Sequence, residues 1–299
     1  HISKGSCVSV CDSSGKLLFY AFTRAGMIGN TTLVIDSTFN IMQNGDSLIG
    51  RGWYNELVIA PKPGSSNMFY LFCNKTTSGD GFYYSLIDMN QNGGLGSVVV
   101  KNLLISTINF SDGMIAIRHG NGRDWWILLQ EWFNNNTFYR YLITPQGISQ
   151  ATQSIGLLNN VGTGDFAFNY TSSELLTVDQ NFRVQVMNFD RCTGQLSNQR
   201  TIENGGFNSM QSFGCSISPN GRFAYVSNTD NIFGDSLRLY QYDLTATNIQ
   251  QSRQTIFKQP VPASGGLHAV GPDGKIYITC LYEYGYPYAD SIHNVYSDN

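Results

Sequence analysis

Residues 215–226 read Cys-Ser-Ile-Ser-Pro-Asn-Gly-Arg-Phe-Ala-Tyr-Val: an alternating stretch, a tight turn that ends in glycine, and a second stretch rich in aromatic and apolar residues. Alternation with period two predicts a strand, and a short turn closed by glycine predicts an antiparallel hairpin. The same pattern begins at residues 8, 57, 115 and 269, and a weaker copy begins at residue 166, with Ser173 in the place of the glycine. We therefore expect a chain built from a repeated β-hairpin unit.

The spacing of these hairpins predicts the architecture. Their turns fall at residues 15, 64, 122, 173, 221 and 274, which are 48 to 58 residues apart. A third alternating stretch follows at residues 81–88, 137–144, 183–190 and 236–243, and pieces such as residues 97–100 and 195–202 can supply an outer edge strand. Four strands in roughly 50 residues are typical of a propeller blade. We expect an all-β β-propeller of four-stranded, WD40/YVTN-like blades, with six blades visible in the sequence and seven in the ring.

Composition excludes several classes of protein. Lys plus Arg number 18 against 21 Asp plus Glu, so the chain has no basic field for a nucleic acid. No apolar run approaches the roughly 18 residues of a membrane helix, and membrane insertion is not expected. The six cysteines form no CxxC pair, so zinc-ribbon spacing is absent. Cys7 and Cys11 lie roughly 13 Å apart along one expected strand and should not bridge each other.

Four segments resemble the propeller region of one protein family. They are residues 5–20, residues 88–96 (Asp-Met-Asn-Gln-Asn-Gly-Gly-Leu-Gly), residues 118–126 (Arg-His-Gly-Asn-Gly-Arg-Asp-Trp-Trp) and residues 271–277. The resemblance is to Bacteroidetes surface proteins that bear a gliding-motility-associated carboxy-terminal sorting domain. It implies cargo of type IX secretion, located outside the cell or on the bacterial outer surface. It also implies that residues 1–299 are a single propeller domain, a fragment of a longer multidomain surface protein, and it supplies no catalytic residues.

A polar and aromatic group around the third turn is a candidate binding site. His119, Arg123 and Asp124 surround this turn, and two tryptophans follow them. Such a group could bind a sugar ring by stacking and hydrogen bonding. The alternative is structural: Arg123 and Asp124 would tie neighbouring blades while the tryptophan pair packs between sheets.

Aromatic residues in expected loops are further candidate contacts. These are Trp53, Tyr54, Trp132, Phe133, Tyr282, Tyr284 and Tyr286. Gly285 and Pro287 interrupt the last of these stretches as a strand, which predicts an exposed aromatic loop. The same loop would alternatively pack against a closing blade, since exposed apolar patches often mark lost partners.

Metal and catalytic motifs are weak. Asp88, Asn90 and Asn92 match the opening of a calcium loop, but Val99 stands where the loop needs a bidentate Glu, and a hairpin turn explains the same residues. No cofactor is therefore expected, with calcium as the alternative. The sequence contains no HExxH motif and no GxSxG elbow, and its carboxylates cannot be paired for glycoside hydrolysis. We predict no catalytic residues.

These observations favour a non-catalytic, secreted or cell-surface propeller that binds protein or glycan, or displays neighbouring modules, as in adhesion or gliding motility. Its partners would be other cell-surface or secretion-system proteins, or an extracellular glycan. Two alternatives stay open. One is a propeller hydrolase or lyase that acts on a polysaccharide or lactone, and the other is a purely structural spacer in a surface assembly.

Overall fold

The computed structural model describes residues 6–24, 31–51, 55–75, 81–159, 164–205, 211–229, 236–260, 263–264, 266–271, 273–279 and 281–282. In this part of the chain all regular structure is β, apart from two single-turn 3-10 helices, η1 (Asn92–Gly94) and η2 (Gln250–Ser252). The all-β class expected from the sequence is therefore confirmed. Among these residues no helix is long and apolar enough to span a bilayer.

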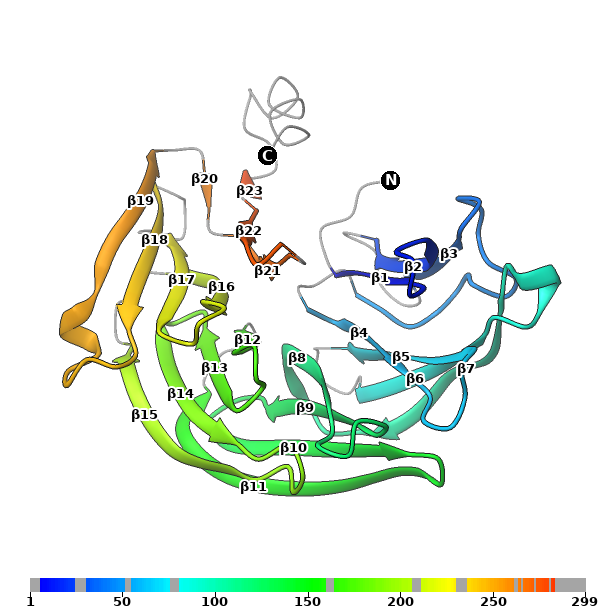
Figure 1. Ribbon diagram of the computed structural model, residues 1–299, viewed down its shortest axis with the longest axis horizontal. Helices are drawn as coiled ribbons and strands as arrows, with labels where there is room; N and C mark the ends of the chain where they lie inside the picture. Colours follow the sequence, from blue (N-terminus) through cyan, green and yellow to red (C-terminus); the bar gives the residue numbers. More distant parts are fainter. Residues whose placement is uncertain are drawn as a thin grey trace. The chain divides into compact units, whose positions relative to one another are not determined.

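The strands form antiparallel sheets that follow one another in chain order (Figure 1). The first sheet contains β1 (Cys7–Cys11), β2 (Leu17–Thr23) and β3 (Thr32–Asp36). Four-stranded sheets follow, and the first of them contains β4 (Leu57–Pro61), β5 (Met68–Lys75), β6 (Gly81–Asp88) and β7 (Ser97–Ser106). The next contains β8 (Phe110–Arg118), β9 (Trp125–Glu131), β10 (Asn135–Thr144) and β11 (Gly147–Asn159), and the one after it β12 (Gly164–Phe168), β13 (Glu174–Asp179), β14 (Arg183–Phe189) and β15 (Leu196–Asn204). Another contains β16 (Gln211–Ile217), β17 (Phe223–Thr229), β18 (Ser236–Asp243) and β19 (Gln254–Pro260). The last described strands pair β20 (Ala263–Ser264) with β23 (Leu281–Tyr282), and β21 (His268–Val270) with β22 (Ile276–Ile278).

Each four-stranded sheet is an up-and-down meander of the kind that the repeat predicts. The expected third strands at residues 81–88 and 236–243 coincide with β6 and β18, and those at 137–144 and 183–190 overlap β10 and β14. The outer strand β7 is longer than the expected piece at residues 97–100, because its pairing with β6 continues through bulges, and β15 ends two residues beyond the expected piece at residues 195–202. Five repeats are thus seen as sheets, and the sixth expected hairpin is β21–β22.

The fourth turn differs from the expectation by one residue. In the other hairpins the turn residues Gly15, Gly122, Gly221 and Gly274 have φ between +74° and +84°, a left-handed conformation that glycine adopts without strain. In the fourth hairpin the residue in this conformation is Ser172, with φ +57°, and its N–H donates to the Asn169 carbonyl at 2.8 Å. The expectation of Ser173 was therefore wrong, because the copy lacks the glycine that marks the position.

The first sheet has three strands among the described residues, where four were expected. The segment at residues 37–50 runs on from β3 but forms only isolated bridges, such as Thr32 with Leu48. Phe39, Asn44 and Ser47 in this segment all have positive φ. A regular strand requires extended backbone at successive residues, so these left-handed positions prevent the segment from completing the sheet.

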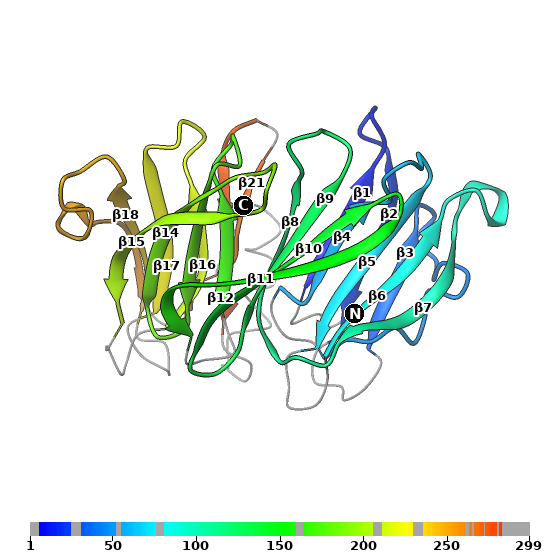
Figure 2. The ribbon, with the colours of Figure 1, turned by 90° about the horizontal axis from the view of Figure 1, so that it is seen from below.

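The chain divides into two compact units, one of residues His1–Thr163 with Asp190–Leu196 and one of residues Gly164–Phe189 with Ser197–Asn299. In the first unit β1 contacts β4 and β4 contacts β8, and in the second β12 contacts β16, which contacts β21. Neighbouring sheets pack through buried apolar clusters, for example Phe19 with Phe69 in the first unit and Val184 with Val226 in the second. Within the first unit the β1–β2 and β8–β9 turns lie at one edge of the sheets, the upper edge in Figure 2.

The junction between β16 and the last hairpin is polar instead of apolar. A Cβ atom on Gly214 would collide with the Gly266 carbonyl, so β16 carries glycine where the following segment approaches most closely. Ser227 Oγ donates to the same carbonyl at 2.7 Å. One step along the strand, Ser216 Oγ lies 2.9 Å from His268 Nδ1. Hydrogen bonds and close backbone approach therefore hold this junction.

Candidate functional site

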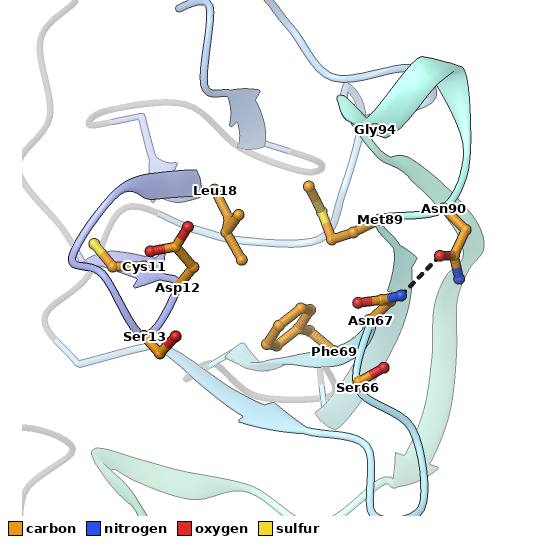
Figure 3. A pocket seen from close by; sticks show the side chains of 10 residues that line it. All are labelled: Cys11, Asp12, Ser13, Leu18, Ser66, Asn67, Phe69, Met89, Asn90 and Gly94. Carbon is orange, nitrogen blue, oxygen red and sulfur yellow. Dashed lines mark hydrogen bonds between the residues drawn. The ribbon is translucent and has the colours of Figure 1, made fainter.

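A groove of about 420 Å³ opens in the first unit between the hairpins of its first two sheets (Figure 3). Its polar lining residues come from three turns: Cys11, Asp12 and Ser13; Ser66 and Asn67; and Asn90. Cavities of several hundred cubic ångströms accommodate ligands the size of a small organic molecule or a side chain with its neighbours. Cys11, like Cys7, is an exposed free thiol, which confirms that the two cysteines do not bridge each other.

The floor of the groove is apolar and belongs to the core. Leu18, Phe69 and Met89 form it, and Phe69 and Met89 are buried. The Phe69 ring packs edge-to-face against Phe19, with 5.5 Å between the ring centroids. Because the hydrophobic cluster between the first two sheets holds these side chains, the floor is part of a rigid, closely packed interior.

Asp12 is ionised at the rim of the groove. Its Oδ1 accepts hydrogen bonds from Ser14 N at 2.8 Å, Ser14 Oγ at 2.6 Å and Lys16 N at 3.0 Å. These bonds, that of the Ser14 hydroxyl first, lower the pKa of the Asp12 carboxyl. The arrangement is an Asx turn, which explains why Asp stands at the start of this hairpin turn. In the described part of the chain, Asp12 Oδ2 accepts no hydrogen bond.

A chain of amide hydrogen bonds orients Asn67 on the other side. The Asp88 carboxylate can only accept, so Asn90 must donate its Nδ2 to Asp88 Oδ1, at 3.0 Å. Asn90 Oδ1 is thereby left to accept from Asn67 Nδ2, at 2.8 Å. Asn67 Oδ1 is then an acceptor that no other described residue uses. Figure 3 shows Asp12 and Asn67 on opposite sides of the groove, with the apolar floor between them.

Of the candidate calcium residues, Asp88 and Asn90 have protein partners. Asp88 Oδ1 also accepts from Asn90 N at 2.9 Å, and Asp88 Oδ2 accepts from Gln91 Nε2 at 3.0 Å. These hydrogen bonds lower the pKa of Asp88. Asn92 begins η1 with φ +49°, in the turn that follows. Within the described ranges no three His, Cys, Asp or Glu side chains gather in a way that could hold a metal ion.

Arg123 and Asp124 form a closed pair within the third turn. Arg123 Nε and NH2 donate to the two Asp124 oxygens at 2.7 and 3.0 Å, and Asn121 Nδ2 adds a bond of 2.8 Å. The Arg123 guanidinium is the main cause of the lowered pKa of Asp124, which is buried. The two predicted binding residues are thus together, but they hydrogen-bond mainly within their own turn.

His119 and Trp126 join this turn to the segment Asp190–Leu196 of the same unit. His119 Nδ1 accepts from Asn121 N at 3.0 Å, so its Nε2 carries the proton and donates to the Cys192 carbonyl at 2.9 Å. Trp126 Nε1 donates to the Arg191 carbonyl at 2.8 Å. The tie between elements that the sequence offered as an alternative is therefore present, although His119 and Trp126 make it and not the Arg123–Asp124 pair.

The aromatic candidates do not gather with that turn. Trp132 follows β9 whereas His119 precedes it, so the length of the strand, roughly 20 Å, separates them. Phe133, beside Trp132, is 72% exposed. The backbone of Tyr282 lies in β23, paired with Ala263 of β20. Trp53, Tyr54, Tyr284 and Tyr286 lie outside the described residues.

Sequence reasoning missed the groove as a site. It singled out Asn90, for calcium, but neither Asp12 nor Asn67. A signal was present, because both residues stand in the first turns of consecutive repeats, and equivalent turns of neighbouring blades emerge at one edge. The sequence pattern does not indicate, however, that a groove lies between the side chains of these turns.

No family model matches this sequence, and no curated protein matches it. Among solved structures, it resembles a Bacteroides fragilis protein assigned as a 6-phosphogluconolactonase, with 13% identity over 93% of this chain and 76% of that one, and a TM-score of 0.60. It also resembles the β-propeller domain of Cps50 (Swd1) from Myceliophteria thermophila, with 11% identity over 91% and 81% of the chains and a TM-score of 0.51. The periplasmic gluconolactonase PpgL of Pseudomonas aeruginosa gives 16% identity over 89% and 71%, with a TM-score of 0.48. Identities this low show a shared fold and no activity.

Proposed function

The chain is an all-β β-propeller, and we propose that it is a non-catalytic binding or display module that takes a protein or glycan ligand in the groove of Asp12, Asn67 and Phe69. The observation that carries this proposal is the groove itself. Its floor is held by the core, and its rim presents two oxygen acceptors that no described residue uses. Turns on a rigid scaffold are where propellers and other β folds place their binding residues.

We also propose that the chain belongs to a secreted or cell-surface protein, with a ring of seven blades. The four segments that resemble gliding-motility-associated surface proteins support the surface assignment, and the six repeats support a ring to which terminal strands add a blade. The partners would be other surface or secretion-system proteins, or an extracellular glycan.

The surface assignment predicts where the native polypeptide is found. Mass spectrometry of cell and culture fractions of the source bacterium should recover peptides of residues 1–299 from the outer surface or medium. A strain that lacks type IX secretion should retain them in the cell. Recovery from the cytoplasm of both strains would contradict the proposal.

Filling the groove should weaken ligand binding. Ser66 is exposed and lines the groove, so Ser66→Trp places an indole in it without disturbing the core. Gln146→Trp is the matched control, because Gln146 is an exposed turn residue that does not line the groove. On glycan and peptide arrays, the original chain and Gln146→Trp should bind the same ligand class, and Ser66→Trp should bind it about tenfold more weakly.

The outcome also separates the alternatives. An array on which no protein binds removes the groove as a binding site and leaves the structural spacer. Equal binding by all three proteins also removes the groove, but it leaves a binding module whose site lies elsewhere. A propeller hydrolase has one observation in its favour, the contact of Ser216 Oγ with His268 Nδ1. Burial, however, lowers the pKa of His268 to about 3, which makes the imidazole a weak base. Turnover of glucono-δ-lactone by the same preparations would nevertheless favour that alternative.

A further inference from the structure

The groove offers free acceptors, and the hydroxyls of Ser13 and Ser66, which also line it, can either donate or accept. The side-chain nitrogens of Asn67 and Asn90 donate within the protein. Asp12 Oδ2 and Asn67 Oδ1, in contrast, accept no hydrogen bond from the described part of the chain. A sugar hydroxyl donates and accepts at once, whereas an ammonium group only donates. The ligand that matches this rim is one that supplies donors.

The rim also carries a negative charge, which Lys16 offsets only in part and from a longer distance than an ion pair. Asp12 is ionised, and no Lys or Arg is among the described residues that line the groove. Lys16 gives Asp12 its backbone N–H and forms no ion pair with it in the described part of the chain. A cationic donor would therefore gain both a charge-assisted hydrogen bond and charge complementarity at this point.

The number of free oxygens distinguishes between the two basic side chains. A guanidinium pairs best with a carboxylate when both oxygens are free to accept in parallel. Asp12 Oδ1 already accepts three hydrogen bonds, so only Oδ2 is open. An ammonium can donate to a single open oxygen, and Asp12 Oδ2 is such an acceptor. The rim thus fits lysine better than arginine.

The floor fits the rest of a lysine side chain. Leu18, Phe69 and Met89 lie between the two polar residues in Figure 3. Lysine buries its methylene stem along apolar surface while its charged end reaches polar groups. The thioether of Met89 adapts its shape to such a stem.

We infer that the groove binds a lysine side chain of a protein partner, with the ammonium on Asp12 Oδ2 and the stem across Phe69 toward Asn67. This inference rests on the proposed function, because it names the ligand chemistry of the same groove. It selects a protein partner over a glycan.

Two thiols of the chain provide the test. Cys11 lines the groove and Cys192 does not, and both are exposed and free. The rate of alkylation at each is measured by mass spectrometry with Nα-acetyl-lysine N-methylamide, its neutral analogue Nα-acetyl-norleucine N-methylamide, or methyl β-glucoside present. The lysine compound should slow alkylation of Cys11 about threefold at saturation relative to Cys192, and high salt should weaken the effect. The other two compounds should leave both rates unchanged.

Variants of the rim residues test whether the rim is responsible for the protection of Cys11 by the lysine compound. Asp12→Asn keeps an oxygen for the Asx turn and removes the charge, so it should weaken the binding of the lysine compound about tenfold. Asp273→Asn is the matched control, because Asp273 accepts from the backbone of its own turn in the same way, outside the groove, and it should change nothing. Asn67→Ser changes the far side of the groove without touching the hairpin turn of Asp12, and should weaken binding less than Asp12→Asn does.

Each contrary result has a distinct meaning. Equal protection by the norleucine compound would overturn the inference, because charge would not matter. Protection by methyl β-glucoside alone would overturn it while leaving the groove as a glycan site, so that the proposed function would survive. No protection by any of the three would overturn it as well, and the array experiment would then decide on the proposed function separately.

Discussion

Replacing Phe82 with alanine should lower the free energy of unfolding by about 3 to 5 kcal/mol. Phe82 on β6 has no exposed surface, and its ring centroid lies 5.0 Å from that of Tyr141 and 5.6 Å from that of Phe72. These rings belong to the cluster through which the sheets β4–β7 and β8–β11 pack in the first unit. Alanine would leave a cavity there, because the residues around the Phe82 ring are also packed against other residues of the cluster and cannot move to fill the space.

Phe133→Ala is the matched control for this loss. The substitution is the same, but Phe133 is 72% exposed in the loop after β9, so its effect should stay within about 0.5 kcal/mol. Urea unfolding followed by circular dichroism measures both. Similar midpoints for the two variants would show that the cluster between these sheets does not stabilise the fold.

Acid should weaken the junction between β16 and the last hairpin. Burial of the His268 ring lowers its pKa from 6.5 to about 3. The folded state therefore binds fewer protons than the unfolded state between these values. The stability that depends on a neutral His268 is complete above pH 6.5. It is lost as the pH falls toward 3, by about 1.4 kcal/mol of unfolding free energy for each pH unit.

Hydrogen exchange of β16 and β21, corrected for intrinsic rates, should show this loss of protection. His268→Asn should remove most of the acid slope while keeping an acceptor for Ser216 Oγ, and His119→Asn should retain the slope because His268 is intact. A slope that persists in His268→Asn would assign the acid sensitivity to another group.

The strands could be predicted because their signals are local. Alternation and a following turn residue marked the ends of β6 and β18 correctly, since buried and partly buried residues alternate toward the end of both strands. Where a local signal was missing, the prediction failed. The fourth turn has no glycine, and there the Asn169 side chain accepts from Ser173 N and Glu174 N while Ser172 takes the left-handed conformation.

The polar group around the third turn shows the limit of reading residues by type. His119, Arg123 and Asp124 were correctly seen as neighbours, because they are adjacent in sequence. The bond from His119 to the Cys192 carbonyl, in contrast, depends on where the segment Asp190–Leu196 lies, because its partner stands 73 residues further on. No spacing rule contains this contact.

The sequence by itself determined the repeated hairpin, the all-β class and the places of most turns, because these follow from side-chain alternation and from backbone conformations that few residues adopt. Only the tertiary structure decided that Asp12 and Asn67 face one groove. They belong to different hairpins, and they are brought to its two sides by the packing of Phe19 against Phe69 beneath them. Packing of that kind is cooperative among many residues, so the groove is a property of the assembled sheets and of no single segment.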